Sequence, residues 1–118
     1  MNVSILGTGA YGLALAMMFY KNGNKIKMWT KFESEKDEIV KTRENKRVLP
    51  GVKIPKNIEI SNDFYEVVND ANLIVIAVPA GFVDDVSFEL SKYYKEDQFV
   101  LLASKGIERD SCLFVADI

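Results

Sequence analysis

Three glycines stand in the spacing G-x-G-x-x-G within the stretch ILGTGAYGLALA, residues 5–16, between an apolar run and an alanine-rich one. In this spacing Gly7 permits a tight turn out of a strand, Gly9 lets the backbone approach a pyrophosphate, and Gly12 allows close packing of helix on strand. The helix that follows offers N–H groups and the positive end of its dipole to phosphates. Because the motif joins a strand-like run to a helical one, it predicts a dinucleotide-binding loop rather than an ordinary turn.

The rest of the chain alternates short apolar runs with helical spacing, which is typical of βαβ units. Strands are predicted at residues 3–6, 25–30, 58–60, 73–78 and 99–103, with Pro79 ending the fourth. Helices are predicted at residues 10–20, 32–44, 61–68 and 82–94, and another from Asp110 onward. We therefore expect one α/β domain over residues 1–118, with a Rossmann-type doubly wound parallel sheet in three layers and the strand order 3-2-1-4-5.

The net charge and the histidine and cysteine content restrict the partners and the catalytic groups that the chain can use. The 118 residues carry a net charge of −2, no histidine and one cysteine, Cys112. The charge balance shows no basic face for nucleic acid, and the longest apolar runs are too short for a membrane anchor. Without histidines or a cysteine cluster we expect no metal site, and acid–base chemistry is left to lysine, a carboxylate or tyrosine, or to another part of the protein. The N-terminus has no secretory signal pattern, so we expect a cytoplasmic protein.

The end of the second strand bears on the choice of cofactor. Sites for NAD commonly place an Asp or Glu there to hold the ribose 2′-hydroxyl. This chain has Thr30, Lys31 and Phe32 instead, with no acid until Glu33. Thr30 and Lys31 suit a 2′-phosphate, which favours tolerance of NADP; alternatively, Lys31 is simply the first exposed residue after a strand.

Ligands of such sheets gather at the carboxyl ends of the strands. Three loops reach that edge: the glycine loop, the loop of residues 78–81 that contains Pro79, and the loop of residues 104–107. Lys105, next to Gly106, is the cation that the fifth strand places beside the cleft. We therefore expect Lys105 to contact a ligand, although a lysine after a strand is more commonly solvated surface.

Four stretches together resemble the bacterial-type NAD(P)-dependent glycerol-3-phosphate dehydrogenases. The loop GTGAYGLALA looks like the family's G-x-G-S-[WY]-G-T-A-L-A, and NKRVLPG, residues 45–51, resembles its N-x-x-Y-L-P-G turn. The strand end IAVP, residues 76–79, is similar to its A-V-P, and SKGIE, residues 104–108, matches its more specific S-K-G-I-E. The resemblance runs along essentially the whole chain in order.

The resemblance implies reduction of dihydroxyacetone phosphate to sn-glycerol 3-phosphate with NADH or NADPH, feeding glycerophospholipid synthesis, in an enzyme that is a homodimer at full length. Lys105 would approach both the cofactor and the small phosphate substrate. The residues expected at the cofactor are Gly7, Gly9, Ala10, Tyr11, Gly12, Lys31, Phe32, Pro79 and Lys105.

Members of the family continue into a helical domain that supplies substrate contacts and a general acid/base lysine. No catalytic residue is therefore expected in this chain, which looks truncated before that domain and inactive alone. Ala10 stands where the family usually has serine, Leu13 where it has threonine, and Asp84 where arginine is frequent. These departures leave room for a divergent paralogue. Two alternatives are a non-catalytic nucleotide-sensing Rossmann module and a related NAD(P)-dependent hydroxy-acid dehydrogenase.

Overall fold

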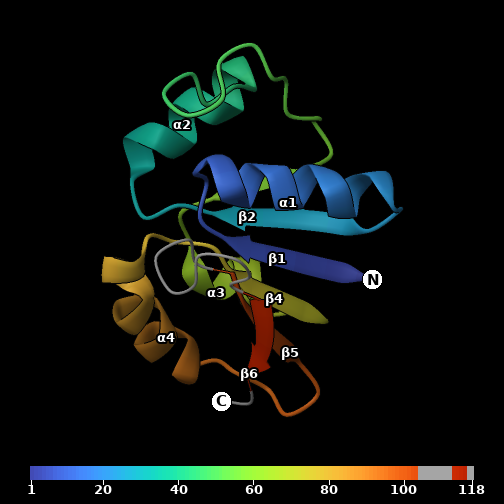
Figure 1. The fold of residues 1–118 in the computed structure, drawn as a ribbon, viewed down its shortest axis with the longest axis vertical. Coiled ribbons are helices and arrows are strands. Elements are labelled where there is room, and N and C mark those ends of the chain that lie inside the picture. Colours follow the sequence, from blue (N-terminus) through green and yellow to red (C-terminus); the bar gives the residue numbers. More distant parts are fainter. Residues whose placement is uncertain (104–112, 117–118) are drawn as a thin grey trace.

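Six strands form one sheet in the spatial order β3-β2-β1-β4-β5-β6 in the computed structural model, which describes residues 1–103 and 113–116 (Figure 1). Strands β1 to β5 are parallel, and β6 runs antiparallel to β5. The strands are β1 (Asn2–Leu6), β2 (Lys25–Trp29), β3 (Glu59–Ser61), β4 (Leu73–Ile76), β5 (Phe99–Ala103) and β6 (Leu113–Ala116). The predicted parallel order 3-2-1-4-5 is confirmed.

Helices cover both faces of this sheet, so the fold has three layers (Figure 1). The helices are α1 (Ala10–Lys21), α2 (Glu33–Thr42), α3 (Phe64–Val68), the one-turn 3₁₀ helix η1 (Ala80–Phe82) and α4 (Val83–Ser91). Helix α1 packs on one face, and α3 and α4 pack on the other. This arrangement is the doubly wound Rossmann-type architecture that the alternating pattern predicts.

The alternation of side chains along β1 explains why both faces are covered. Val3 and Ile5 belong to the core under α1, whereas Leu6 belongs to the core under α3 and α4. Ser4 points to the α3 side, where its hydroxyl donates a hydrogen bond to the Val67 carbonyl. A parallel strand buried on both faces reads as a nearly continuous apolar run, which in β1 only Ser4 interrupts between Val3 and Leu6.

The helix predicted from Asp110 onward is wrong for residues 113–116, which form β6 instead. A run of four apolar residues is too short for periodicity to separate helix from strand. Pairing with β5 satisfies backbone groups that an edge strand would leave exposed, and this tertiary gain is invisible in the sequence. Residues 104–112 and 117–118 lie outside the described residues, and with them the loop containing Lys105 and the single Cys112.

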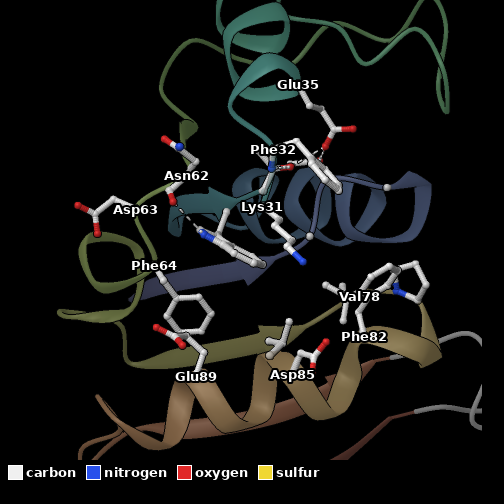
Figure 2. Close-up of a pocket in the computed structure, with 18 of the residues that line it drawn as sticks. Lys31, Phe32, Glu35, Asn62, Asp63, Phe64, Val78, Phe82, Asp85 and Glu89 are labelled. Atoms are coloured by element: carbon white, nitrogen blue, oxygen red, sulfur yellow. Dashed lines mark hydrogen bonds between the residues drawn. The ribbon is translucent and has the colours of Figure 1, made fainter.

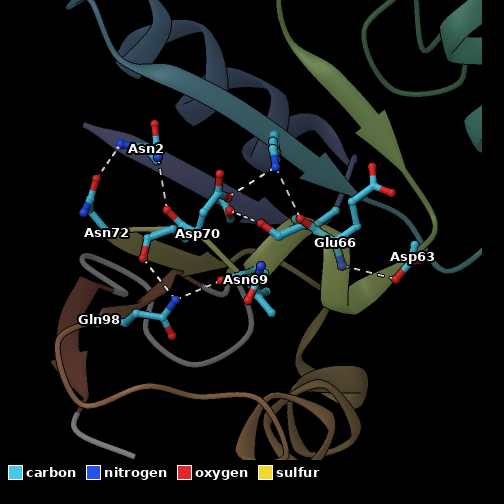
Figure 3. Close-up of polar contacts among 12 residues, drawn as sticks. Asn2, Asp63, Glu66, Asn69, Asp70, Asn72 and Gln98 are labelled. Atoms are coloured by element: carbon cyan, nitrogen blue, oxygen red, sulfur yellow. Dashed lines mark hydrogen bonds and ion pairs between the residues drawn. The ribbon is translucent and has the colours of Figure 1, made fainter.

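Polar side chains tie the strands together at their amino ends (Figure 3). The buried amide of Gln98, just before β5, donates to the carbonyls of Val68 at 2.8 Å and Ala71 at 3.0 Å, where α3 ends. The side-chain oxygen of Asn72 accepts from the backbone N–H of Asn2 at 2.7 Å. This network lies at the edge of the sheet opposite the glycine loop and leaves the carboxyl edge to the site.

Candidate functional site

The loop from β1 to α1 is pressed against the end of β4 at Gly7. Its backbone N–H donates to the Trp29 carbonyl at 2.8 Å, and its φ of +133° is one that L side chains rarely adopt. A Cβ atom on Gly7 would lie 2.3 Å from the Ala77 carbonyl oxygen. Only glycine fits here, and its close approach brings the carboxyl ends of β1, β2 and β4 to one point.

Gly12 and Gly9 stand in opposite environments. A Cβ atom on Gly12 would lie 2.7 Å from the Gly7 carbonyl oxygen, so the first turn of α1 rests directly on the loop. Gly9 is the N-cap residue of α1, and no atom lies within 4 Å of the position that its Cβ would take. The first turn of α1 has no acidic side chain of its own to offset the positive end of the helix dipole, and the space beside Gly9 is open. These features fit a bound pyrophosphate.

Thr8 lies between the first two glycines, and polar contacts hold both its hydroxyl and its backbone carbonyl. Its hydroxyl donates to Oε1 of Glu35, which also accepts from the Thr30 hydroxyl at 2.7 Å. Its carbonyl accepts from the Asn45 side-chain amide at 2.9 Å. Thr8, Thr30 and Asn45 are each at most 5% exposed. The glycine loop is therefore fixed in advance to the end of β2 and to the segment after α2.

Arg43 fixes the segment that carries Asn45. Arg43 ends α2 in a left-handed conformation with φ of 58°, and its guanidinium donates to the carbonyls of Ile54 at 3.1 Å, Ile58 at 2.6 Å and Pro55. Burial lowers the pKa of Arg43, but a guanidinium stays charged at any ordinary pH. The segment thus returns to β3 along a defined path, which explains how Asn45 can brace a loop 37 residues away in sequence.

Beside the glycine loop a cleft of about 720 Å³ opens between the end of β2 and helix α4 (Figure 2). Lys31 points into the cleft, with Nζ 5.9 Å from the centre of the Phe82 ring. The lining combines glycine-loop backbone, aromatic rings and charged side chains. It includes Gly7, Thr8, Gly9, Trp29, Thr30, Lys31, Phe32, Glu35, Asn45, Arg47, Asp63, Phe64, Val78, Pro79, Phe82, Asp85, Glu89 and Tyr93.

Aromatic side chains build the inner wall of this cleft. The Trp29 and Phe64 rings meet edge to face with centres 5.1 Å apart, and Phe64 and Tyr93 lie 6.2 Å apart. Phe32 and Phe82 are 57% and 45% exposed, which leaves apolar surface open at the mouth. Flat apolar walls beside the open space at Gly9 suit a planar base joined to a pyrophosphate.

The structure brings five of the predicted site residues to the cleft: Gly7, Gly9, Lys31, Phe32 and Pro79. Three others lie in the first turn of α1, outside the lining: Ala10, Tyr11 and Gly12. Lys105 lies outside the described residues, so its predicted contacts with cofactor and substrate stay predictions.

Two residues with clear roles at the cleft escaped the sequence reasoning. Glu35 belongs to no motif, although an acid in the first turn of the helix after the second strand is a usable signal. Asn45 begins the NKRVLPG stretch, and its position in that turn is the signal that could have marked it. The acids of α4, Asp85 and Glu89, also line the cleft without any motif to indicate it.

The described residues contain neither a metal-binding cluster nor a membrane-spanning helix. No group of three or more Cys, Asp or Glu side chains in residues 1–103 and 113–116 is arranged to hold a metal ion. Within the same ranges, no helix has the length and apolar character needed to cross a membrane.

The parallel sheet, its switch point and the braced glycine loop define a Rossmann-type α/β domain. The family model described as "NAD-dependent glycerol-3-phosphate dehydrogenase N-terminus" matches residues 2–118. The chain therefore belongs to this family of N-terminal dehydrogenase domains.

Individual relatives agree with this assignment. The chain is 32% identical over 116 residues to a glycerol-3-phosphate dehydrogenase [NAD(P)+] of Fusobacterium nucleatum, covering 98% of this chain and 35% of that protein. It is 34% identical over 118 residues to the enzyme of the same name from a Thermoanaerobacter species, covering 100% of this chain and 36% of the relative. The chain thus spans about a third of the length of these curated relatives.

A solved structure shares the fold. The crystal structure of glycerol-3-phosphate dehydrogenase from Coxiella burnetii superposes with a TM-score of 0.84 at 24% identity, covering 92% of this chain and 33% of that one.

Proposed function

We propose that residues 1–118 form the NAD(P)-binding domain of a glycerol-3-phosphate dehydrogenase and bind the dinucleotide in the cleft beside the glycine loop. One observation carries the proposal: open space at Gly9 lies between two glycines, Gly7 and Gly12, that admit no side chain. A pyrophosphate can approach the backbone of such a loop at Gly9, while Gly7 and Gly12 pack against the rest of the protein.

The rest of the dinucleotide would follow the cleft in both directions from Gly9. Lys31 and Phe32 would face the adenosine half at the end of β2, opposite Phe82. Pro79, which follows β4, would adjoin the nicotinamide half, with Lys105 beside it. Ala10 and Tyr11 would contribute through the first turn of α1, whose N–H groups point toward bound anions.

The proposed reaction is reduction of dihydroxyacetone phosphate to sn-glycerol 3-phosphate. The reduced dinucleotide supplies a hydride to the carbonyl carbon, and the carbonyl oxygen takes up a proton from an acid. Lys105 would assist by pairing with the substrate phosphate or by polarising the carbonyl, since a fixed cation stabilises the oxygen as negative charge develops. The names of the relatives and the SKGIE stretch support this substrate.

Because the chain spans only about a third of the length of its relatives, the proposal assigns the remaining functions to the rest of the protein. Substrate contacts and the general acid/base lysine would come from the helical remainder, so residues 1–118 alone would be inactive. The complete enzyme would be a cytoplasmic homodimer that supplies glycerol 3-phosphate for glycerophospholipid synthesis. No nucleic acid or membrane anchor enters this proposal.

Calorimetric titration of the purified chain with NADH and with NADPH tests the proposal directly. We expect saturable binding of at least one of them, and no oxidation of NADPH or NADH when dihydroxyacetone phosphate is added. A folded chain that binds neither dinucleotide would overturn the proposed site. Turnover by the 118 residues alone would overturn the assignment of catalysis to the remainder.

A further inference from the structure

Glu35 brings a carboxylate to the end of β2, where residues 30–32 have none. The residues that follow β2 are Thr30, Lys31 and Phe32, and Glu35 stands in the first turn of α2. Its Oε1 accepts hydrogen bonds from the hydroxyls of Thr30 and Thr8, so the side chain folds back from the helix onto the strand (Figure 2). Neither bond uses Oε2, and Glu35 is part of the cleft lining.

The lining of the cleft as a whole is also negative on balance. Among the described residues that line the cleft, four side chains are acidic and two are basic. The acids are Glu35, Asp63, Asp85 and Glu89, and the bases are Lys31 and Arg47. A phosphate monoester adds about −1.5 to −2 charges at neutral pH. Bringing it into such a cleft costs free energy, whereas a ribose hydroxyl can donate a hydrogen bond to a fixed carboxylate.

We propose that Glu35 selects the cofactor, and that the cleft prefers a dinucleotide with a free ribose 2′-hydroxyl over one with a 2′-phosphate. This inference rests on the proposed function, because it deepens the choice between NAD and NADP at the same site. It reverses the expectation drawn from Thr30 and Lys31. Lys31 is exposed and reaches toward the Phe82 ring, whereas Glu35 is held by two buried hydroxyls.

Glu35→Gln is the central test, because the amide keeps the shape of the side chain and an oxygen that both threonine hydroxyls can use. The dissociation constants of NADH and NADPH are measured by calorimetry for both proteins. In the unaltered chain NADH should bind at least about tenfold more tightly than NADPH, the scale of one charge-assisted hydrogen bond. In Glu35→Gln the ratio of the NADPH dissociation constant to the NADH dissociation constant should fall by about tenfold or more.

Glu38→Gln is the matched control. It removes the same charge one turn further along α2, from an exposed residue that does not line the cleft. The ratio of the NADPH to the NADH dissociation constant should be unchanged in this variant. Thr30→Val provides a second route, because it removes one hydroxyl that holds Glu35 at the end of β2. Like Glu35→Gln, it should lower the ratio of the two dissociation constants. A thermal melt of each variant checks that it is folded.

The outcomes separate this inference from the function on which it rests. A ratio that stays the same in Glu35→Gln overturns it, as does tighter binding of NADPH by the unaltered chain. An equal loss of affinity for both dinucleotides also overturns it, since Glu35 would then only brace the loop. If the folded chain binds neither dinucleotide, the proposed function fails, and the inference fails with it.

Discussion

Replacing Gly9 by alanine should separate dinucleotide binding from folding. The backbone at Gly9, with φ −72° and ψ −178°, is one that alanine adopts freely, and the added methyl would have no neighbour within 4 Å. Alanine restricts the unfolded chain and is a poorer N-cap than glycine, and these small effects oppose each other. The free energy of unfolding should therefore change by less than about 1 kcal/mol.

Binding should respond much more strongly. The methyl would occupy the space in which the pyrophosphate meets the start of α1. Displacing the phosphates would remove about one charge-assisted hydrogen bond, worth about 1.5–3 kcal/mol, which raises the dissociation constant of NADH roughly 10- to 150-fold. Calorimetric titration gives the affinity, and urea unfolding followed by circular dichroism gives the stability.

Gly12→Ala is the comparison variant. Its methyl would lie 2.7 Å from the Gly7 carbonyl oxygen, and such overpacking costs about 1–3 kcal/mol. The better helix propensity of alanine returns about 1 kcal/mol. Gly12→Ala should thus lose both stability and affinity, whereas Gly9→Ala loses affinity alone. Normal NADH binding by a folded Gly9→Ala protein would refute the argument that the ligand approaches this residue.

Three further predictions concern other parts of the molecule. In the complete enzyme, Lys105→Ala should lower kcat/KM for dihydroxyacetone phosphate by about 10² or more, the scale of a lost electrostatic stabiliser, and near-normal kinetics would mean that Lys105 is only surface. Gln98→Met should lower the free energy of unfolding by about 1–3 kcal/mol in urea, because the Val68 and Ala71 carbonyls each lose the side-chain donor; an unchanged midpoint would count against that network. The Lys53 ammonium, 2.8 Å from Glu44, and the backbone N–H of Gly51 hold the pKa of Glu44 below its usual range. Since the folded pKa lies below the unfolded one, this stabilisation is complete above about pH 4.3 and is lost as the pH falls through the folded value. A chemical-shift titration of Glu44 by NMR should show the lowered pKa, and it should return toward normal in Lys53→Met.

Periodicity and glycine spacing were sufficient for most of the fold. The alternation of β-branched strands with helices predicted the five parallel strands and their order, since right-handed crossovers allow few other arrangements. The prediction failed at Leu113–Ala116, where a short apolar run has no periodicity of its own. This segment forms a strand because it pairs with the open edge of β5, which belongs to another part of the chain.

At the site, motif residues were predictable and their supports were not. Gly7, Gly9, Lys31, Phe32 and Pro79 follow strand ends, and strand ends meet at one edge of a parallel sheet. Glu35 and Asn45 act through Thr8, and no local pattern connects positions 27 and 37 residues apart.

By itself, the sequence determined the architecture, the location of the cleft and the resemblance to one dehydrogenase family. These follow from residue type and spacing along the chain, because backbone geometry and side-chain alternation are local properties. Only the tertiary structure decided how the glycine loop is held and which charge stands at the end of β2. A hydrogen bond to Glu35 depends on where two distant backbones lie in space, and a folded core alone sets that distance.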